Sequence, residues 1–200
     1  HGLITEVLPR RNRLARQDPN PGAHKFEQVV VSNVDIIIPV FAAASPTPKW
    51  GLLDRYLVSA ESLNLSTLVV ITKLDLVRGP DGKLDHGLQV SIDEYRRIGY
   101  SILLTSSVSG EGLEELRQTL KGRLSAFVGK SGVGKTALLN ALEPGLGLRV
   151  GLVGAGKVGK GKHTTTAAEM IATSFGADIV DTPGVREFGL FDIDGDDLAM

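Results

Sequence analysis

Short apolar runs and segments of helical spacing alternate along most of the chain. Five runs rich in Val, Ile and Leu follow residue 33, at positions 34–41, 68–71, 102–105, 125–128 and 178–180. They hardly alternate with polar residues, which is typical of strands that are buried on both faces. Between them, apolar residues recur at helical spacing in four segments, at positions 52–63, 90–98, 113–120 and 136–142. Strands that alternate with helices predict an α/β domain with a mostly parallel sheet.

The first 32 residues have a different pattern. Residues 2–8 alternate apolar and polar side chains, and a cluster of arginines follows, comprising Arg10, Arg11, Arg13 and Arg16. The turn-forming sequence Asp-Pro-Asn-Pro-Gly occupies residues 18–22. We interpret residues 1–32 as the last strands of a small β module and a connection. The arginines either protect a solvated strand edge from pairing or contact phosphate groups, and the pattern leaves both interpretations open.

Composition narrows the classes of protein to which the chain can belong. It has 200 residues, of which 42% are hydrophobic and 22% are charged, and its formal net charge is −1. These values are ordinary for a globular protein without overall basic character, so any contact with nucleic acid must come from a local patch. The absence of cysteine excludes disulfides, a thiol nucleophile and a cysteine-ligated zinc ion within these residues.

Two further features concern location and the limits of the chain. The longest apolar run, residues 36–44, contains Pro39 and is much shorter than the ~20 residues that a membrane-spanning helix needs. We therefore expect no association with a membrane, and a cytoplasmic location. Because the chain begins with His1, in a segment that resembles the middle of a strand, we also expect it to be trimmed at both ends from a longer protein.

A phosphate-binding motif lies in the second half of the chain. The pattern G-x-x-x-x-G-K-[ST] is matched by Gly129, Lys130, Ser131, Gly132, Val133, Gly134, Lys135 and Thr136. An apolar strand precedes the motif, and an apolar helix continues from Ala137. In this arrangement the loop N–H groups and the helix N-terminus bind phosphate, and Lys135 reaches the β- and γ-phosphates. The Thr136 hydroxyl would coordinate Mg²⁺.

Two further boxes favour guanine as the base. The first follows the run at 68–71, resembles the [N/T]-K-x-D sequence of GTPases and consists of Thr72, Lys73, Leu74 and Asp75. The Asp75 carboxylate would accept hydrogen bonds from the N1–H and the amino group of guanine, a donor pair that adenine lacks. The second follows the run at 102–105, resembles the S-A box and consists of Ser106 and Ser107. There a backbone N–H would contact the guanine O6 atom.

A third element, D-x-x-G, follows the last apolar run at residues 181–184. Asp181 would hold Mg²⁺ through water, and the Gly184 N–H would meet the γ-phosphate. A glycine-rich basic segment, residues 144–168, precedes this element, and we expect it to be a mobile loop rather than a packed element. It contains three candidates for the switch threonine, which are Thr164, Thr165 and Thr166. We take Thr165 as the expected Mg²⁺ ligand.

Catalysis requires a group that orients the attacking water. Many GTPases carry Gln directly after D-x-x-G, but this chain carries Val185, which forms no side-chain hydrogen bond. We therefore expect slow intrinsic turnover. The catalytic candidates are Lys135, Thr165 and His163, the histidine as the residue that orients water near neutral pH. A solvent-exposed loop histidine without a catalytic role is the alternative for His163.

A competing motif lies within the glycine-rich segment. Residues 154–159 fit the dinucleotide-binding pattern G-x-G-x-x-G, and Asp178 lies at a suitable distance for a ribose partner. That pattern should open an apolar-faced helix, but the sequence Lys-Gly-Lys-His-Thr follows instead. Residues compatible with a helix begin only near Ala167. The pattern therefore disfavours a Rossmann site.

The order of the boxes differs from that of ordinary GTPases. Here the base box comes first, then the S-A box, the phosphate loop, the switch threonine and D-x-x-G. This order is a circular permutation, in which residues 119–124, with Gly122 as the turn, join the former ends of the domain. The new chain end follows D-x-x-G, so we infer as a hypothesis that the permutation couples the nucleotide state to the next domain.

The motifs together resemble the ribosome small-subunit-dependent GTPase A (RsgA) family. The resemblance rests on the permuted boxes, on the strings GKSGVGKT, GKGKHTTT and DTPGVREFGL, and on Asn33-Val34-Asp35 and Asp54-Arg55-Tyr56-Leu57. It covers nearly the whole chain. It implies the tail of an OB-type β-barrel in residues 1–32, a three-layer, permuted P-loop GTPase domain in residues 33–200, and a zinc-binding domain after residue 200.

The resemblance also implies function. Family members hydrolyse GTP to GDP with Mg²⁺, late in maturation of the small ribosomal subunit, and the ribosome stimulates the reaction. The expected partners are that subunit and its rRNA, the expected state is a monomer, and Zn²⁺ belongs only to the expected further domain. A GTP-dependent ribosome-binding switch with negligible turnover is the alternative. A P-loop ATPase or small-molecule kinase is a second one, which competition between ATP and GTP would test.

Overall fold

The computed structural model describes residues 3–17, 27–79, 82–148 and 169–181. The strands are β1 (Arg13–Gln17), β2 (Glu27–Ser32), β3 (Ile36–Ala42), β4 (Ser66–Thr72), β5 (Ser101–Leu104), β6 (Leu124–Val128), β7 (Glu169–Ala172) and β8 (Asp178–Asp181). The helices are α1 (Trp50–Ser62), α2 (His86–Arg97), α3 (Leu113–Leu120) and α4 (Lys135–Leu142), with short 3₁₀ helices η1 (Leu74–Leu76) and η2 (Pro144–Leu146).

Six of the strands form one sheet in the order β5-β4-β3-β6-β8-β7. All neighbours in it are parallel except β7, which pairs antiparallel with β8 at the edge. The strands β1 and β2 form a separate antiparallel pair. The predicted α/β domain with a mostly parallel sheet is confirmed.

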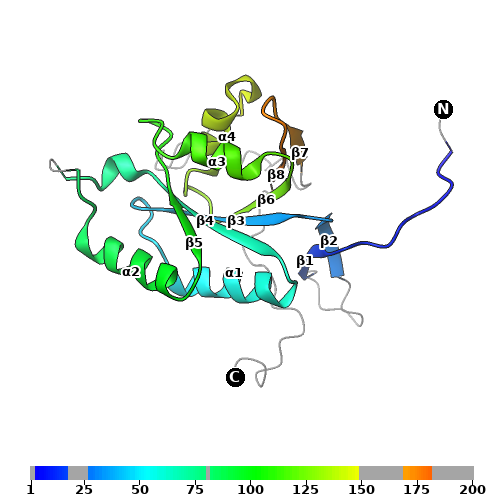
Figure 1. Cartoon of the computed structure of the whole chain (residues 1–200), viewed down its shortest axis with the longest axis horizontal. Helices are drawn as coiled ribbons and strands as arrows, with labels where there is room; N and C mark the ends of the chain where they lie inside the picture. Colours follow the sequence, from blue (N-terminus) through cyan, green and yellow to red (C-terminus); the bar gives the residue numbers. More distant parts are fainter. Residues whose placement is uncertain (1–2, 18–26, 80–81, 149–168, 182–200) are drawn as a thin grey trace, which may run out of the picture.

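Helices cover both faces of this sheet, α1 and α2 on one face and α3 and α4 on the other (Figure 1). Neighbouring residues of β3 enter opposite cores, because successive side chains of a strand point to opposite faces. Ile37 packs in the core that contains Leu53 of α1, and Ile38 packs in the core that contains Leu138 of α4. Burial on both faces explains why the apolar runs hardly alternate, and the predicted three-layer arrangement is confirmed.

The predicted helices and core strands are present with small shifts at their ends. α3 has the predicted bounds, whereas α2 begins at His86, earlier than the apolar spacing indicated. The Asp85 carboxylate accepts a hydrogen bond from the Leu88 N–H at 3.1 Å and so caps α2. No α-helix among the described residues is long and apolar enough to cross a membrane.

One prediction of local structure is wrong, and one strand was not predicted. Residues 3–8 form no strand, and their large apolar side chains are exposed, because no strand in the described part of the chain pairs with them. The helix-compatible residues after Ala167 instead contain β7, whose backbone pairs with β8 from Glu169 to Ala172. The sequences at 18–22 and 154–159 lie outside the described residues.

The chain passes from α3 into β6 through a tight turn, the predicted join of the permuted domain. Gly122 has a φ of +72°, a conformation that glycine adopts readily, and its N–H donates to the Gly176 carbonyl at 2.7 Å. The Arg123 N–H donates to the Leu120 carbonyl at 3.0 Å. This turn allows β6, which precedes the phosphate loop, to pair in parallel with both β3 and β8.

A polar cluster fastens the segment before β1 to the sheet. The Asp35 carboxylate accepts from the Leu124 N–H at 2.8 Å and from Arg11 Nη2 at 2.9 Å. The side chain of Asn12 exchanges two hydrogen bonds with the backbone of Val34. The Leu124 N–H, and then Arg11, lower the pKa of Asp35 below its ordinary value, against the opposing effect of burial. The cluster thus joins the starts of β3 and β6 to the N-terminal segment.

Candidate functional site

The phosphate motif connects β6 to α4, as the sequence predicts. Gly129 follows β6 directly with a φ of +153°, and a Cβ atom there would lie 2.4 Å from the Val40 carbonyl oxygen. Only glycine permits this approach of the loop to β3. Gly134 precedes α4 with a φ of +94°, and no side chain caps the helix. The helix N-terminus and the loop therefore present N–H groups suited to a phosphate.

Lys135 folds back over its own loop. Its Nζ donates to the Gly129 carbonyl at 2.6 Å and lies 3.4 Å from the Lys130 carbonyl. Burial lowers the pKa of Lys135, and the negative charge of Asp181 partly opposes that effect. A phosphate anion would replace the carbonyl oxygens as a stronger partner for this ammonium group.

The base box is joined to the phosphate loop by two side chains. Thr72 is buried, and its hydroxyl donates to the Val133 carbonyl at 2.5 Å and lies 3.2 Å from the Phe41 carbonyl. Lys73, which has a left-handed backbone conformation, donates through Nζ to the Gly132 carbonyl at 2.8 Å. Leu74 is buried beneath the box. The loops that should bind the base and the phosphates therefore form one connected unit.

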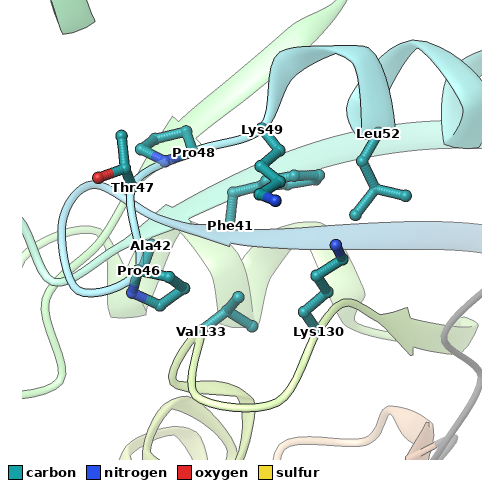
Figure 2. Close-up of a pocket in the computed structure, with 9 residues that line it drawn as sticks. All are labelled: Phe41, Ala42, Pro46, Thr47, Pro48, Lys49, Leu52, Lys130 and Val133. Atoms are coloured by element: carbon teal, nitrogen blue, oxygen red, sulfur yellow. The ribbon is translucent and has the colours of Figure 1, made fainter.

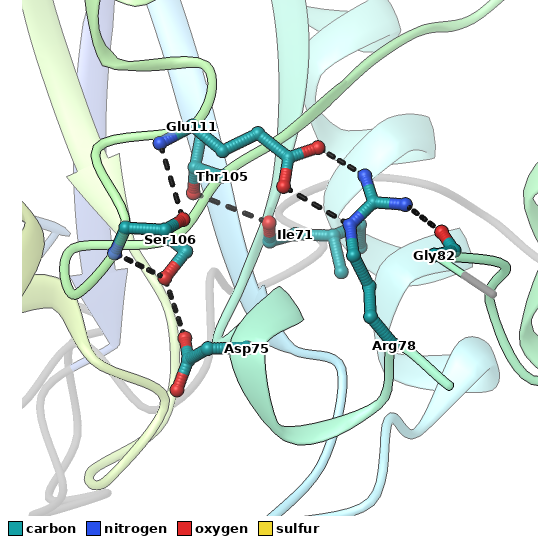
Figure 3. A network of polar contacts seen from close by, with 8 residues as sticks. Ile71, Asp75, Arg78, Gly82, Thr105, Ser106 and Glu111 are labelled. Carbon is teal, nitrogen blue, oxygen red and sulfur yellow. Dashed lines mark hydrogen bonds and ion pairs between the residues drawn. The ribbon is translucent and has the colours of Figure 1, made fainter. Parts of the chain in front are cut away.

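The two guanine boxes also meet. The Ser106 hydroxyl donates to Asp75 Oδ1 at 2.5 Å (Figure 3). It accepts from the N–H groups of Val108 and Ser109, both at 3.2 Å. Ser106 is fully buried, whereas Asp75 is exposed within η1, shortly after the end of β4. Ser107 is half-buried beside them. A buried hydroxyl thus orients an exposed carboxylate, as a base-recognition site requires.

The candidate Mg²⁺ ligands are partly described. Asp181 ends β8 opposite Phe127 of β6, next to the phosphate loop, and its charge acts on Lys135. Thr136 lies in the first turn of α4. A hydroxyl and a carboxylate are oxygen ligands of the kind that Mg²⁺ prefers together with phosphate oxygens, so the donor set fits this ion.

Several predicted residues lie outside the described residues. These are His163, Thr164, Thr165 and Thr166 of the glycine-rich segment, and Gly184 and Val185 after β8. Their roles stay predictions. The start of the glycine-rich segment is described and is packed: Asn140 exchanges two hydrogen bonds with the Leu148 backbone. The expectation that the segment is unpacked is therefore wrong for residues 144–148, which follow α4 closely.

A small cavity lies beside the phosphate loop, between it and the segment after β3 (Figure 2). Its lining is mostly apolar with two lysines, and consists of Phe41, Ala42, Pro46, Thr47, Pro48, Lys49, Leu52, Lys130 and Val133. Its volume of about 40 Å³ is far below the several hundred Å³ of a typical ligand pocket. The cavity is therefore too small to hold a nucleotide.

Sequence reasoning missed several contacts in the site. It placed Lys73 and Ser106 in the two guanine boxes, but it predicted neither the hydrogen bond from Lys73 to Gly132 nor that from Ser106 to Asp75. It also missed Arg78 and Glu111, which form an ion pair behind the guanine boxes. The only signal for them was their position shortly after each box, because their pairing depends on the order of β4 and β5 in the sheet.

The chain is similar to proteins of one family over most of its length. The family model described as RsgA GTPase matches residues 7–191. A protein from Pseudomonas putida named small ribosomal subunit biogenesis GTPase RsgA is 42% identical over 197 residues, which cover 98% of this chain and 55% of the relative. A protein of the same name from Gemmatimonas aurantiaca is 44% identical over 196 residues, covering 98% and 61%. The chain thus spans little more than half the length of these relatives.

Two solved structures are similar to this chain in fold and in sequence. YjeQ from Thermotoga maritima has a TM-score of 0.69 and 36% identity, covering 96% of this chain and 58% of that one. YloQ, described as a circularly permuted GTPase, has a TM-score of 0.60 and 26% identity, covering 95% and 62%. The predicted permuted GTPase fold is confirmed by this likeness.

Proposed function

The chain belongs to the RsgA GTPase family, and from this membership and the geometry of the site we propose that it binds and hydrolyses GTP during maturation of the small ribosomal subunit. The observation that carries the proposal is the contact between Ser106 and Asp75. It orients a carboxylate in the same box whose Thr72 and Lys73 contact the phosphate loop. An adenine site has no use for such a carboxylate, because adenine lacks the adjacent pair of donors, N1–H and the 2-amino group, that guanine presents.

The chemistry proposed is in-line attack of water on the γ-phosphorus, with departure of GDP. Lys135 leaves the Gly129 carbonyl and stabilises the charge of the β- and γ-phosphates, while the loop N–H groups contact the phosphate oxygens. Bound Mg²⁺ supplies further positive charge, and Thr136, Thr165 and Asp181 are the residues proposed to hold it.

The proposed catalytic role of His163 is to orient the attacking water, because Val185 stands where many GTPases have Gln. The Gly184 N–H is proposed to contact the γ-phosphate, and one of Thr164, Thr165 and Thr166 to close over it. Since D-x-x-G is the last box in the permuted order, the state of the γ-phosphate would act directly on the residues that follow.

The proposed partners and organisation follow the family. Residues 1–32 are proposed to be the end of an OB-type barrel, and residues 33–200 the permuted GTPase domain. The small ribosomal subunit and its rRNA are the proposed partners of a cytoplasmic monomer. A zinc-binding domain is proposed to lie beyond these residues and to take its ligands there, since this chain has no cysteine.

The test measures nucleotide preference first and turnover second. Displacement of a fluorescent GDP analogue should be far more effective with GTP than with ATP, and Asp75→Asn should weaken GTP binding and favour xanthosine triphosphate. GTP affinity that survives Asp75→Asn would reject the base-box assignment.

Turnover should then rise when purified small ribosomal subunits are added, in this chain and in a version extended to the length of the relatives. GTP binding without stimulation in either version would reject the assigned partner. If the ribosome binds only the GTP-loaded protein and hydrolysis stays negligible, the alternative of a binding switch replaces that of an enzyme.

A further inference from the structure

An ion pair outside the nucleotide motifs connects the two loops that carry the guanine boxes. Arg78 donates through Nε to Glu111 Oε2 at 3.1 Å and through Nη2 to Glu111 Oε1 (Figure 3). The use of both carboxylate oxygens gives a bidentate contact, which fixes the relative orientation of the two side chains as well as their separation. Arg78 Nη1 also donates to the Gly82 carbonyl at 2.6 Å, so the guanidinium is held on two sides.

This pair closes a ring of contacts behind the candidate base site. The Glu111 carbonyl accepts from the Ser106 N–H at 3.0 Å, and the Ser106 hydroxyl donates to Asp75. On the other side of the ring, the Arg78 N–H donates to the Leu74 carbonyl at 3.1 Å, directly beside Asp75. A displacement of Glu111 therefore displaces Ser106, and Ser106 is the group that orients the Asp75 carboxylate.

The Arg78–Glu111 pair contributes more to the orientation of the Asp75 carboxylate than to the stability of the fold. Asp75 is exposed, and an exposed carboxylate samples several rotamers unless neighbouring groups restrict it. The side chains of Arg78 and Glu111 are 34% and 36% exposed, and pairs this exposed contribute little to stability. The hydrogen bond to Glu111 raises the pKa of Arg78 above its ordinary value.

We propose that Arg78 and Glu111 are positioning residues for guanine recognition, which hold the Asp75 carboxylate, through Ser106, in line with the amino group of the base. Neither residue touches the nucleotide in this proposal. The inference rests on the proposed function, because it presupposes a guanine nucleotide in the site.

The sharpest readout compares GDP with IDP, whose base lacks the amino group that Asp75 would bind. Arg78→Ala or Glu111→Ala should weaken GDP binding more than IDP binding. The ratio of the two affinities should fall by roughly threefold to tenfold, a part of the tenfold or more that a full charge-assisted hydrogen bond supplies. A general loss of structure would instead weaken both nucleotides alike.

The measurement is displacement of a fluorescent GDP analogue from this chain and its variants, with melting temperatures as a check on folding. The ratio of GDP to IDP affinity should fall no further in the double variant than in either single variant, because the two residues act as a unit. In an Asp75→Ala background, breaking the pair should change the ratio no further. Arg78→Lys, which keeps the charge but not the bidentate geometry, should behave like Arg78→Ala and serves if the alanine variant fails to fold.

The matched control is Glu114→Ala, which breaks an exposed pair with Arg117 on α3 and should leave the ratio unchanged. Two failures are distinguishable. A wild-type chain that binds GDP no better than ADP would reject the proposed function itself. If the wild-type chain prefers GDP, two results would overturn the positioning role and leave the guanine site intact. One is that the single variants keep the full ratio of GDP to IDP affinity. The other is that they still change this ratio in the Asp75→Ala background.

Discussion

The contact between Thr72 and the phosphate loop offers a quantitative test of how the site is held together. Thr72 is 2% exposed, and its hydroxyl donates to the Val133 carbonyl at 2.5 Å. Thr72→Val keeps the shape of the side chain but replaces the donor with a methyl group. The substitution therefore removes one buried hydrogen bond and leaves the Val133 carbonyl facing an apolar atom.

The expected cost follows from the loss of that partner. A buried polar group left without its partner costs about 1–3 kcal/mol. In a domain of this size each kcal/mol changes the melting temperature by about 2–4 °C. Thr72→Val should therefore lower the melting temperature by about 4–8 °C, if the cost lies near 2 kcal/mol. GDP affinity should fall as well, because the loop that carries Val133 loses its connection to the base box.

Two variants separate the hydrogen bond from other effects. Thr72→Ser retains the hydroxyl and should melt closer to the wild type than Thr72→Val does. Thr67→Val, in the same strand, removes a half-buried hydroxyl whose contact with the Leu65 carbonyl is 3.4 Å long, so it should have little effect. Thermal melts followed by circular dichroism, with and without GDP, give these values. Equal melting temperatures for Thr72→Val and the wild type would refute the reasoning.

Three further results are expected. Gly129→Ala should cost about 2–4 kcal/mol and abolish GDP binding, because its Cβ would lie 2.4 Å from the Val40 carbonyl oxygen. The control is Gly51→Ala in α1, where a Cβ atom would meet nothing within 4 Å, and its stability should rise by up to about 1 kcal/mol. Urea titration measures both variants, and an equal loss of stability in the two would contradict the argument. The pKa of Asp35 lies below its ordinary value of 3.8. The contribution of ionised Asp35 to the free energy of unfolding is therefore present above pH 3.8 and is lost as the pH falls through the folded-state pKa. Asp35→Asn should thus lower stability at pH 7 by about 0.5–1 kcal/mol, and a gap that persists unchanged in urea titrations well below pH 4 would be inconsistent with this assignment. His163→Ala should reduce single-turnover GTP hydrolysis while sparing GDP binding, and unchanged turnover would remove His163 from the mechanism.

Most of the sheet and all four α-helices follow from the apolar pattern. The bounds of α3 match the predicted segment, and the central strands β3, β4 and β6 lie within two residues of the predicted runs. These elements are predictable because burial on two faces requires long apolar stretches in the chain itself. β7 was missed because it is a short edge strand, and its backbone pairing with β8 determines its conformation more than its side chains do.

The candidate site also has a part that the sequence predicts and a part that it does not. The sequence alone is enough to recognise the boxes that contain Asp75, Ser106, Lys135 and Asp181. Binding of phosphate and guanine requires particular residue types at a fixed local spacing. The sequence also determines their permuted order. What only the tertiary structure decided is how the boxes hold one another.

Contacts between the boxes join residues that are distant in the chain. The bond from Lys73 to Gly132 spans 59 positions, and the pair of Arg78 with Glu111 spans 33. Neither spacing corresponds to a helical or strand period, so no local pattern reports it. These partners meet because the sheet brings the carboxyl ends of β4, β5 and β6 to one edge, and that order is a property of packing across the whole domain.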